Sequence, residues 1–322
     1  MAKRALLLVL VLILGISYAV SAQGETSPQK GAEKPTIVIP NLKIENISNS
    51  WGPVSSDITT IITKVLVNEP NLSLVPLSIS CNIYLNDIKM SEGVGENLTI
   101  ERVASGSLVL FTSKIDNENI VKWWLSHIKN GERSKVKIEG KLIISLEKVN
   151  LVYPFSWETK FQTNILEGLN TKKMVRFNFG LYALEIRSLH SKWGKVTAKE
   201  TEVKHTVKIY NPSIIPGSPI VRKIKYELSL NGIKMAEGNT GLLPMIIWPG
   251  KTKLITFATK MDNRKIKAWW ISHINSEEKT HYRFSYRFYF SIGSTKWRDR
   301  KGAFKTNFLA KTGDIDCVKS SD

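Results

Sequence analysis

The sequence contains few of the residue types that build metal centres or disulfide frameworks. It has two cysteines and five histidines in 322 residues. Cys81 lies in an alternating apolar segment and Cys317 in a polar tail, so we expect two separate thiols and no disulfide framework. Because the histidines are dispersed and none follows His-Glu-Xaa-Xaa-His spacing, we expect no metal site and no other cofactor.

The motifs of common enzyme classes are also missing. The chain contains no Gly-Xaa-Ser-Xaa-Gly nucleophile elbow, no P-loop and no Gly-Xaa-Gly-Xaa-Xaa-Gly fingerprint. The adjacent acids Glu277 and Glu278 lie in a polar segment, where we expect a solvated turn and not a catalytic pair. The sequence therefore predicts a protein that has no catalytic residues and is not an enzyme.

Acidic residues are scarce relative to basic ones. The chain has 28 acidic and 46 basic residues, a formal net charge of +18. No nucleic-acid-binding motif accompanies this charge, so we expect no nucleic acid partner. Lysines such as Lys204 and Lys208 alternate with apolar residues, which is typical of the solvated face of a sheet. The alternative is attraction to anionic lipid head groups or acidic envelope polymers.

The amino-terminal apolar run, residues 5–16, is shorter than the roughly 20 residues that a membrane-spanning helix needs. It follows Lys3 and Arg4 and precedes a small-residue segment that ends at Ala22, the pattern of a secretory signal peptide. We predict that residues 1–22 are either a cleaved signal or a retained anchor. Both place the chain outside the cytoplasm, secreted or anchored. Residues 23–36 lack apolar periodicity and are expected to form a disordered tether.

Most of the remaining chain is a duplication. Leu-Asn-Asp-Ile-Lys-Met-Ser-Glu-Gly at 85–93 returns as Leu-Asn-Gly-Ile-Lys-Met-Ala-Glu-Gly at 230–238. Trp-Trp-Leu-Ser-His-Ile from Trp123 returns as Trp-Trp-Ile-Ser-His-Ile from Trp269. The period is that of a domain, since solenoid units repeat every 20 to 50 residues or so. We predict repeat 1 at 37–171, repeat 2 at 172–312 and a polar tail at 313–322, and these two names are used below.

Apolar and polar residues alternate in both repeats with the period of two that is typical of strands. Asn231-Gly232 supplies the positive φ angles of a tight hairpin turn. The chain is thus expected to form mainly β structure, as antiparallel sandwiches. The rows that we predict to point inward are Ile79, Cys81, Ile83 and Leu85; Val203, His205, Val207 and Ile209; Ile224, Tyr226, Leu228 and Leu230; and Phe284, Tyr286, Phe288 and Phe290.

Each repeat is predicted to contain one helix, at 117–129 after Asp116 and at 263–275 after Asp262. Adjacent tryptophans lie about 100° apart on a helix, so we expect one of each pair to pack on a sheet. The outer ones, Trp123 and Trp269, either join the helix core or form a partly exposed contact surface for a ligand or lipid.

A family resemblance emerges in repeat 2. Tyr-Asn-Pro ends one strand at Pro212, Pro-Ile begins the next, Tyr226 stands within it, and Asn-Gly, Ala-Glu-Gly and Pro-Gly-Lys-Thr segments follow. This order resembles the type 2 late-embryogenesis-abundant family, whose water stress and hypersensitive response domain would occur here in tandem. The matching positions, for which we expect structural roles, are Asn211, Pro212, Tyr226, Gly232 and Gly238, with Asn68 and Pro70 in repeat 1.

The resemblance implies two tandem Ig-like or fibronectin-III-like sandwich domains, each with a short helix, and a role in stress tolerance without catalysis. We therefore expect an exported, non-catalytic protein of the desiccation or water-stress response, which protects membranes or client proteins by surface contact. The alternative is a cell-envelope binding or adaptor module that recognises anionic lipid or polymer through its basic surface.

Overall fold

A computed structural model describes residues 36–38, 44–68, 76–91, 96–145, 149–172, 174–214, 219–291 and 293–305. Residues 36–322 form one compact unit. The predictions for the signal or anchor at 1–22, for the tether up to residue 35 and for the tail at 313–322 lie outside the described residues, as do those for Pro70 and Cys317. Thr36, which we assigned to the tether, instead begins a strand that pairs with residues 150–152.

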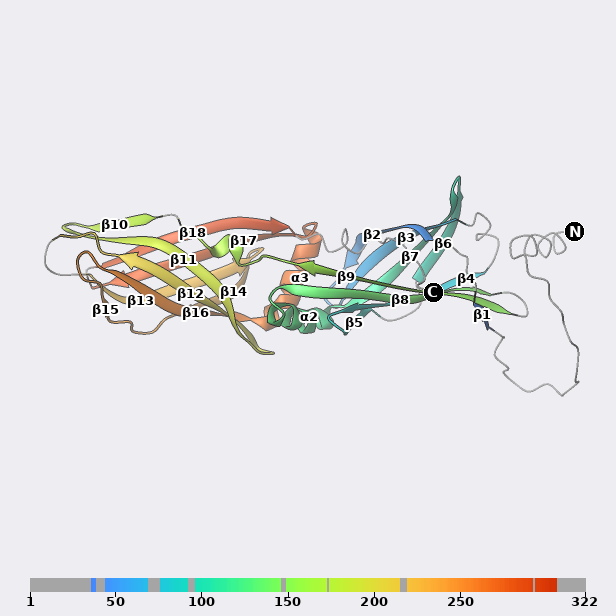
Figure 1. The fold of residues 1–322 in the computed structure, drawn as a ribbon, viewed down its shortest axis with the longest axis horizontal. Coiled ribbons are helices and arrows are strands. Elements are labelled where there is room, and N and C mark those ends of the chain that lie inside the picture. Colours follow the sequence, from blue (N-terminus) through green and yellow to red (C-terminus); the bar gives the residue numbers. More distant parts are fainter. Residues whose placement is uncertain are drawn as a thin grey trace, which may run out of the picture. The chain divides into compact units, whose positions relative to one another are not determined.

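The order of elements is repeated along the chain (Figure 1). In repeat 1 the elements are β1 (Thr36–Val38), β2 (Ile44–Val54), β3 (Ile58–Val67), β4 (Leu77–Leu85), β5 (Ile88–Ser91), β6 (Glu96–Val103), β7 (Gly106–Asp116), α2 (Asn117–Lys129), β8 (Arg133–Ser145), β9 (Asn150–Gln162) and η2 (Glu167–Leu169). In repeat 2 they are β10 (Val175–Phe179), β11 (Tyr182–Val196), β12 (Glu200–Tyr210), β13 (Ile220–Leu230), β14 (Ile233–Asn239), β15 (Met245–Ile246), β16 (Thr252–Asp262), η3 (Asn263–Lys265), α3 (Ile266–Asn275), β17 (Lys279–Phe290) and β18 (Gly293–Lys305).

The strands common to the two repeats pair in the same order, whereas the pairings of β6 with β7, β1 with β9 and β10 with β11 each occur in one repeat of the described chain. In repeat 2 one sheet has the order β10-β11-β12-β16 and the other β14-β13-β17-β18, with β15 on β13. Repeat 1 has the orders β2-β3-β7 and β5-β4-β8-β9, which a single residue pair, Ser91 with Ile115, joins into one sheet. The described pairings are antiparallel apart from β1 with β9. The predicted mainly β, antiparallel fold is confirmed, whereas the Ig-like or fibronectin-III-like type and the domain boundaries stay predictions.

The core of repeat 2 lies between its two sheets, and the inward rows predicted for it are confirmed. The ring of Phe257 on β16 stacks on that of Tyr226 on β13 with centroids 6.3 Å apart, and His205 on β12 lies 5.2 Å from Phe284 on β17. In repeat 1, Ile79 and Cys81 are buried, while Ile83 and Leu85 pack against the core at half burial. Burial of the apolar faces is the main favourable term in folding such sandwiches.

Both predicted helices are present. The helix α2 has the predicted bounds, and its N-cap Asp116 accepts a hydrogen bond from the backbone N–H of Glu118 at 2.9 Å. Asp262 does the same for Arg264 at 3.1 Å, but the first turn there is the 3₁₀ helix η3 and α3 follows it. Within the described part of the chain, neither helix is both long and apolar enough to cross a bilayer.

Replacing Gly106 by alanine should destabilise the fold severely. Gly106 has φ +148°, and a Cβ there would overlap the backbone carbonyl of Val67 on the neighbouring strand. Strain and steric overlap together should cost at least about 3 kcal/mol of unfolding free energy, measured by urea denaturation. The matched control is Gly180→Ala, where φ is +65° but nothing lies within 4 Å, so a cost of about 1 kcal/mol is expected. Equal costs for the two variants would contradict the role assigned to Gly106.

Candidate functional site

All four tryptophans of the two helices are buried where α2 and α3 meet. Trp123, Trp124 and Trp269 are 1% exposed and Trp270 is 2% exposed. Of the two alternatives for Trp123 and Trp269, packing in the helix core is confirmed and the partly exposed contact surface is wrong. It failed because each helix packs against the other helix as well as against its own strands, so both of its tryptophan-bearing faces are covered. Neither indole is accessible to a ligand or a lipid.

The tryptophan contacts between the helices are reciprocal. Trp123 of repeat 1 lies 5.9 Å from Trp270 of repeat 2, and Trp124 lies 5.3 Å from Trp269, both as ring-centroid distances in near edge-to-face arrangements. Exchanging the repeats turns one contact into the other. We call this region, together with the strands beside it, the junction. It has the pattern of a two-fold interface built within one chain.

Two buried glutamates complete the junction from opposite repeats. Trp193 Nε1 of repeat 2 donates to Glu132 Oε1 of repeat 1 at 2.8 Å, and Trp51 Nε1 of repeat 1 donates to Glu278 Oε1 of repeat 2 at 3.0 Å. Glu132 is 7% exposed and Glu278 is 6% exposed. The prediction that Glu278 is solvated is wrong, because Trp51 from the other repeat covers it. The spacing that relates the two Trp-Trp pairs also relates Glu132 to Glu278, and this signal could have identified both.

A chain of hydrogen bonds runs from Trp123 to Glu132 through the core of repeat 1. Trp123 Nε1 donates to Ser134 Oγ at 2.9 Å, Ser134 Oγ lies 2.8 Å from His127 Nδ1, His127 Nε2 lies 2.8 Å from Thr163 Oγ1, and Thr163 Oγ1 donates to Glu132 Oε2 at 2.8 Å. An indole nitrogen only donates and a carboxylate only accepts, so the direction of the chain is set. Ser134 then donates to Nδ1, and the Nε2 proton of His127 is donated to Thr163.

The corresponding residues of repeat 2 are bonded in the same way. Trp269 Nε1 donates to Thr280 Oγ1 at 2.9 Å, and His273 Nδ1 lies 2.8 Å from the same oxygen. Thr280 occupies the place of Ser134, because both follow the helix histidine by seven residues. The two helix histidines are therefore buried and hydrogen-bonded alike in the two repeats.

Burial depresses the basicity of three histidines. It lowers the pKa of His127 to about 4, although the neighbouring Glu132 acts in the opposite direction. It lowers the pKa of His273 to about 4 and that of His205 to about 3. His205 lies between the sheets, where its ring nitrogens meet Ser191 Oγ at 2.9 Å and Thr259 Oγ1 at 3.0 Å. All three rings are neutral at neutral pH.

The hydrogen-bonded side chains around Glu132 help to join the repeats, and they present no accessible nucleophile. Ser134, His127 and Glu132 are the residue types of a hydrolase triad, but Ser134 is 2% exposed and already accepts the Trp123 indole proton. Cys81 is a free, buried thiol, and burial raises its pKa to about 12. Among the described residues, no group of three or more histidine, cysteine and acidic side chains is placed to hold a metal ion.

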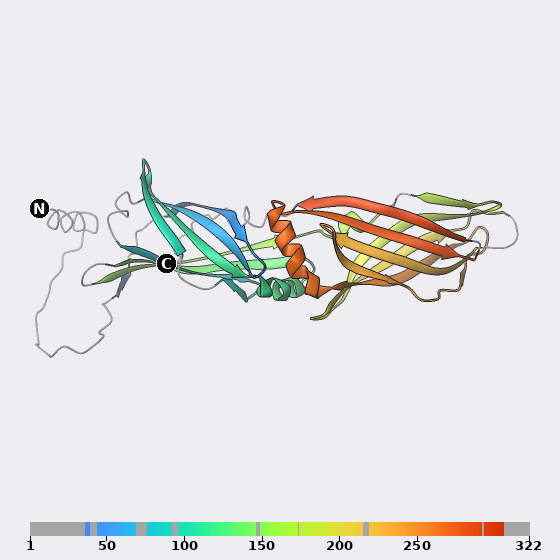
Figure 2. The same ribbon diagram turned by 180° about the vertical axis from the view of Figure 1, so that it is seen from behind.

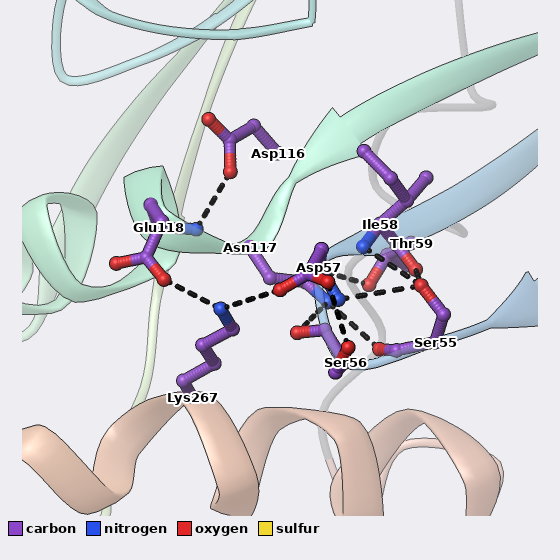
Figure 3. A network of polar contacts seen from close by, with 9 residues as sticks. All are labelled: Ser55, Ser56, Asp57, Ile58, Thr59, Asp116, Asn117, Glu118 and Lys267. Atoms are coloured by element: carbon purple, nitrogen blue, oxygen red, sulfur yellow. Dashed lines mark hydrogen bonds and ion pairs between the residues drawn. The ribbon is translucent and has the colours of Figure 1, made fainter.

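A polar cluster fastens the start of α2 to the turn between β2 and β3 (Figure 3). The side-chain amide of Asn117, which is 0% exposed, donates to the carbonyls of Ser55 and Ser56, and its oxygen accepts from Thr59 Oγ1 at 2.6 Å. Lys267 of α3 enters the same cluster, 3.0 Å from Asp57 Oδ1 and paired with Glu118 (Figure 3). The residue of repeat 1 equivalent to Lys267 is Val121, and the residues of repeat 2 equivalent to Asp57 and Glu118 are Lys199 and Arg264. The ion pairs of Lys267 therefore have no counterpart on the other side of the junction.

Of the family-motif positions, Asn211 is the most extensively bonded. It is 0% exposed; its side chain donates to the carbonyl of Ile247 at 2.7 Å and accepts from the N–H of Ser213 at 3.0 Å. Its backbone N–H donates to Lys251 and its carbonyl accepts from Gly250. The half-buried Pro212 follows it. Asn211 thus ties the end of β12 to the loop before β16, which is a structural role.

The other motif residues shape one hairpin of repeat 2. Asn231 and Gly232 have φ +47° and +79° in the turn between β13 and β14, as predicted. Tyr226 pairs with Gly238 across these strands, and a Cβ on Gly238 would lie 2.6 Å from the Tyr226 hydroxyl, so the tyrosine requires a glycine there. In repeat 1, Asn68 is exposed just after β3, unlike its buried counterpart in repeat 2.

No family model matches the chain, and no curated protein matches it. Among solved structures, a protein from Archaeoglobus fulgidus is 24% identical, with 38% of this chain and 98% of that chain covered and a TM-score of 0.31. A protein from Arabidopsis thaliana solved in solution is 14% identical, covering 44% and 92%, with a TM-score of 0.29. A β-glucuronidase from Parabacteroides merdae is 11% identical, covering 79% and 28%, with a TM-score of 0.23.

The unfolding free energy should fall as the pH falls from about 6.5 to 5. In the unfolded chain a histidine binds a proton near pH 6.5, whereas in the folded protein the pKa values of His127 and His273 are about 4 and that of His205 is about 3. The unfolded state therefore binds more protons in this window, and each histidine should cost about 2 kcal/mol at pH 5. Urea denaturation across this range measures the loss, and His205→Gln should reduce the slope. Constant stability down to pH 5 would contradict the prediction.

A double-mutant cycle should reveal the coupling between the repeats. Trp193→Phe removes the indole proton from Glu132 but keeps an aromatic ring, so it should cost about 1 to 3 kcal/mol of unfolding free energy. When Glu132→Gln is already present, the same change should cost clearly less, because no buried carboxylate then loses a donor. The matched pair is Trp51→Phe with Glu278→Gln, which should behave alike. Strictly additive effects in both cycles would refute the coupling.

Proposed function

We propose that this chain is an exported, non-catalytic protein of the type 2 late-embryogenesis-abundant kind, which protects membranes or other proteins during water stress through contact with its surface. The observation that carries the proposal is that the duplicated aromatic and titratable residues are buried inside the protein. The repeated tryptophans, histidines and glutamates are buried and serve the junction and the cores. Interaction with other molecules is therefore left to the exposed surface.

The exposed lysines of that surface support contact that needs no dedicated pocket. The strand lysines that we expected on a solvated face, such as Lys204 and Lys208, are exposed on β12, and the neighbouring Lys192 and Lys260 are exposed as well. Lys204 and Lys260 have acidic neighbours on the same sheet. Exposed pairs of this kind are weak and exchange readily with water and with other anions. A rigid core with a basic surface suits many weak contacts.

A second candidate is an envelope-binding module that recognises one anionic lipid or polymer. The net charge of +18 favours it, since such a surface attracts anions over a distance set by the ionic strength. The two candidates differ in their dose dependence. Protection by surface contact grows with the mass of protein present, whereas recognition of one ligand saturates at a fixed stoichiometry and weakens with salt.

The decisive experiment dries an unrelated enzyme with and without this protein and measures the activity recovered on rehydration. We use residues 23–322, which contain the whole compact unit from residue 36. Recovered activity should rise steadily with added protein and exceed that with an equal mass of an unrelated folded basic protein. Recovery no better than with this control, at every mass ratio, would sink the proposal.

A further inference from the structure

Large apolar side chains are exposed in one part of the molecule. All those found among the described residues lie between residues 174 and 254, so they belong to repeat 2. The most exposed are Ile214 at 96%, Leu242 at 83% and Leu181 at 82%. Six of them form what we call the apolar tip: Leu181, Ile214, Leu242, Ile246, Trp248 and Leu254.

The topology gathers the apolar tip at the end of repeat 2 that lies opposite α3. The helix joins the end of β16 to the start of β17. The tip residues instead precede β11, follow β12, or lie between Leu242 and Leu254, a stretch that includes β15 and the first residues of β16. Figures 1 and 2 both show β10 and β15, which flank this end, far from α3 within the repeat. Ile246 pairs with Ile220 at the start of β13, and Leu254 pairs with Lys208 near the end of β12.

Hydrogen bonds hold the loops of the tip in place. The side chain of Asn211 donates to the carbonyl of Ile247, and the N–H of Lys251 donates to the carbonyl of Trp248, which closes the turn that carries the indole. The N–H of Ala183 donates to Ser213 Oγ at 3.0 Å, which links the turn containing Leu181 to the loop containing Ile214. The tip is therefore a built surface whose exposed apolar side chains come from three hydrogen-bonded segments of the chain.

Basic residues surround the tip and acidic ones are nearly missing. The described segments that form this end, 175–189, 206–214, 219–226, 240–258, 286–291 and 293–297, contain ten basic residues and one acidic residue. The acid, Glu185, is 6% exposed and pairs with Arg187 at 3.2 Å and Arg176 at 3.7 Å. Arg187 also lies over the ring of Tyr210, 3.6 Å from its centroid. This end is thus positively charged, with its only acid covered.

The equivalent end of repeat 1 has a different character. Its described residues expose no large apolar side chain. Its strands β2 and β6 carry Glu45, Glu96 and Glu101. The reciprocal tryptophan and glutamate contacts of the junction are therefore alike in both repeats, whereas the described residues of the two free ends differ in charge.

We propose that the apolar tip of repeat 2 inserts into the interface of an anionic lipid bilayer. The tip presents its apolar side chains from three segments of chain, around Leu181, around Ile214 and from Leu242 to Leu254. Such an arrangement suits a fluid lipid surface, into which apolar groups enter by about 5 to 10 Å. The surrounding lysines and arginines then meet anionic head groups. Trp248, 59% exposed, is suited to this boundary because its ring is apolar and its N–H can bond to head groups or water.

This inference rests on the proposed function in one respect, since it names the membrane as the contacted surface and the tip as the contact. A protein partner would need a shape complementary to six side chains spread over several loops. The bilayer needs only the combination of exposed apolar groups and positive charge that is present. Insertion would place repeat 2 against the membrane and leave repeat 1 farther from it.

The test measures co-sedimentation of residues 23–322 with vesicles of phosphatidylcholine alone or mixed with phosphatidylserine. The triple variant Leu181→Ser, Ile214→Ser, Trp248→Ser changes exposed side chains only, so it should keep the urea midpoint of the parent chain. Its partitioning onto anionic vesicles should fall by about tenfold or more, because the apolar groups that enter the interface are lost. Lys251→Glu with Lys253→Glu should weaken binding more than the same charge change at Lys64 and Lys129 of repeat 1.

Fluorescence provides a readout of insertion itself. Brominated lipids should quench part of the tryptophan emission, and this part should vanish in Trp248→Phe, which keeps an apolar ring and should still bind. Equal partitioning of the triple variant and the parent would overturn the inference, as would a parent chain that binds no anionic vesicle. Neither result would decide the proposed function, because protection of a dried enzyme is measured without lipid.

Discussion

The structure depends on two buried carboxylates that each repeat satisfies for the other. A buried charge is costly unless it is fully hydrogen-bonded. Glu132 accepts from Thr163 and from the backbone N–H of Ile165 within its own repeat, but Trp193 of repeat 2 supplies the third donor. Glu278 likewise depends on Trp51 of repeat 1. Separating the repeats would leave both carboxylates short of a donor and expose the helix tryptophans, so the two repeats form one unit.

This constraint explains why the duplicated residues do not form a binding site. The helix tryptophans and histidines resemble functional residues in a sequence, because they are aromatic or titratable and occur twice. In the structure the tryptophans fill the space between α2 and α3, and the histidines bond to neighbouring hydroxyls. Exposed large apolar side chains are found instead at the other end of repeat 2, in the apolar tip. The duplicated aromatic residues and the exposed apolar residues of repeat 2 thus occupy opposite ends of that repeat.

Much of the fold could be predicted from local patterns. The alternation from Val203 to Ile209 places four side chains inside, and Asn231-Gly232 makes the expected turn. The bounds of α2 follow from the cap at Asp116 and from helical spacing. The burial of both tryptophans of a pair was not predictable in this way. A helix packed on one sheet has an outer face, and Trp193 and Trp269 of the other repeat cover Trp124 there.

By itself, the sequence determined the duplication, the strand rows, the helix positions and the excess of positive charge. Each of these depends on neighbours within a few residues or on simple counts. The tertiary structure alone decided that Glu278 is buried and that Leu181, Ile214 and Trp248 share one end of a repeat. These outcomes depend on contacts between segments that are far apart along the chain, and local periodicity carries no information about which distant surface covers a side chain or leaves it exposed.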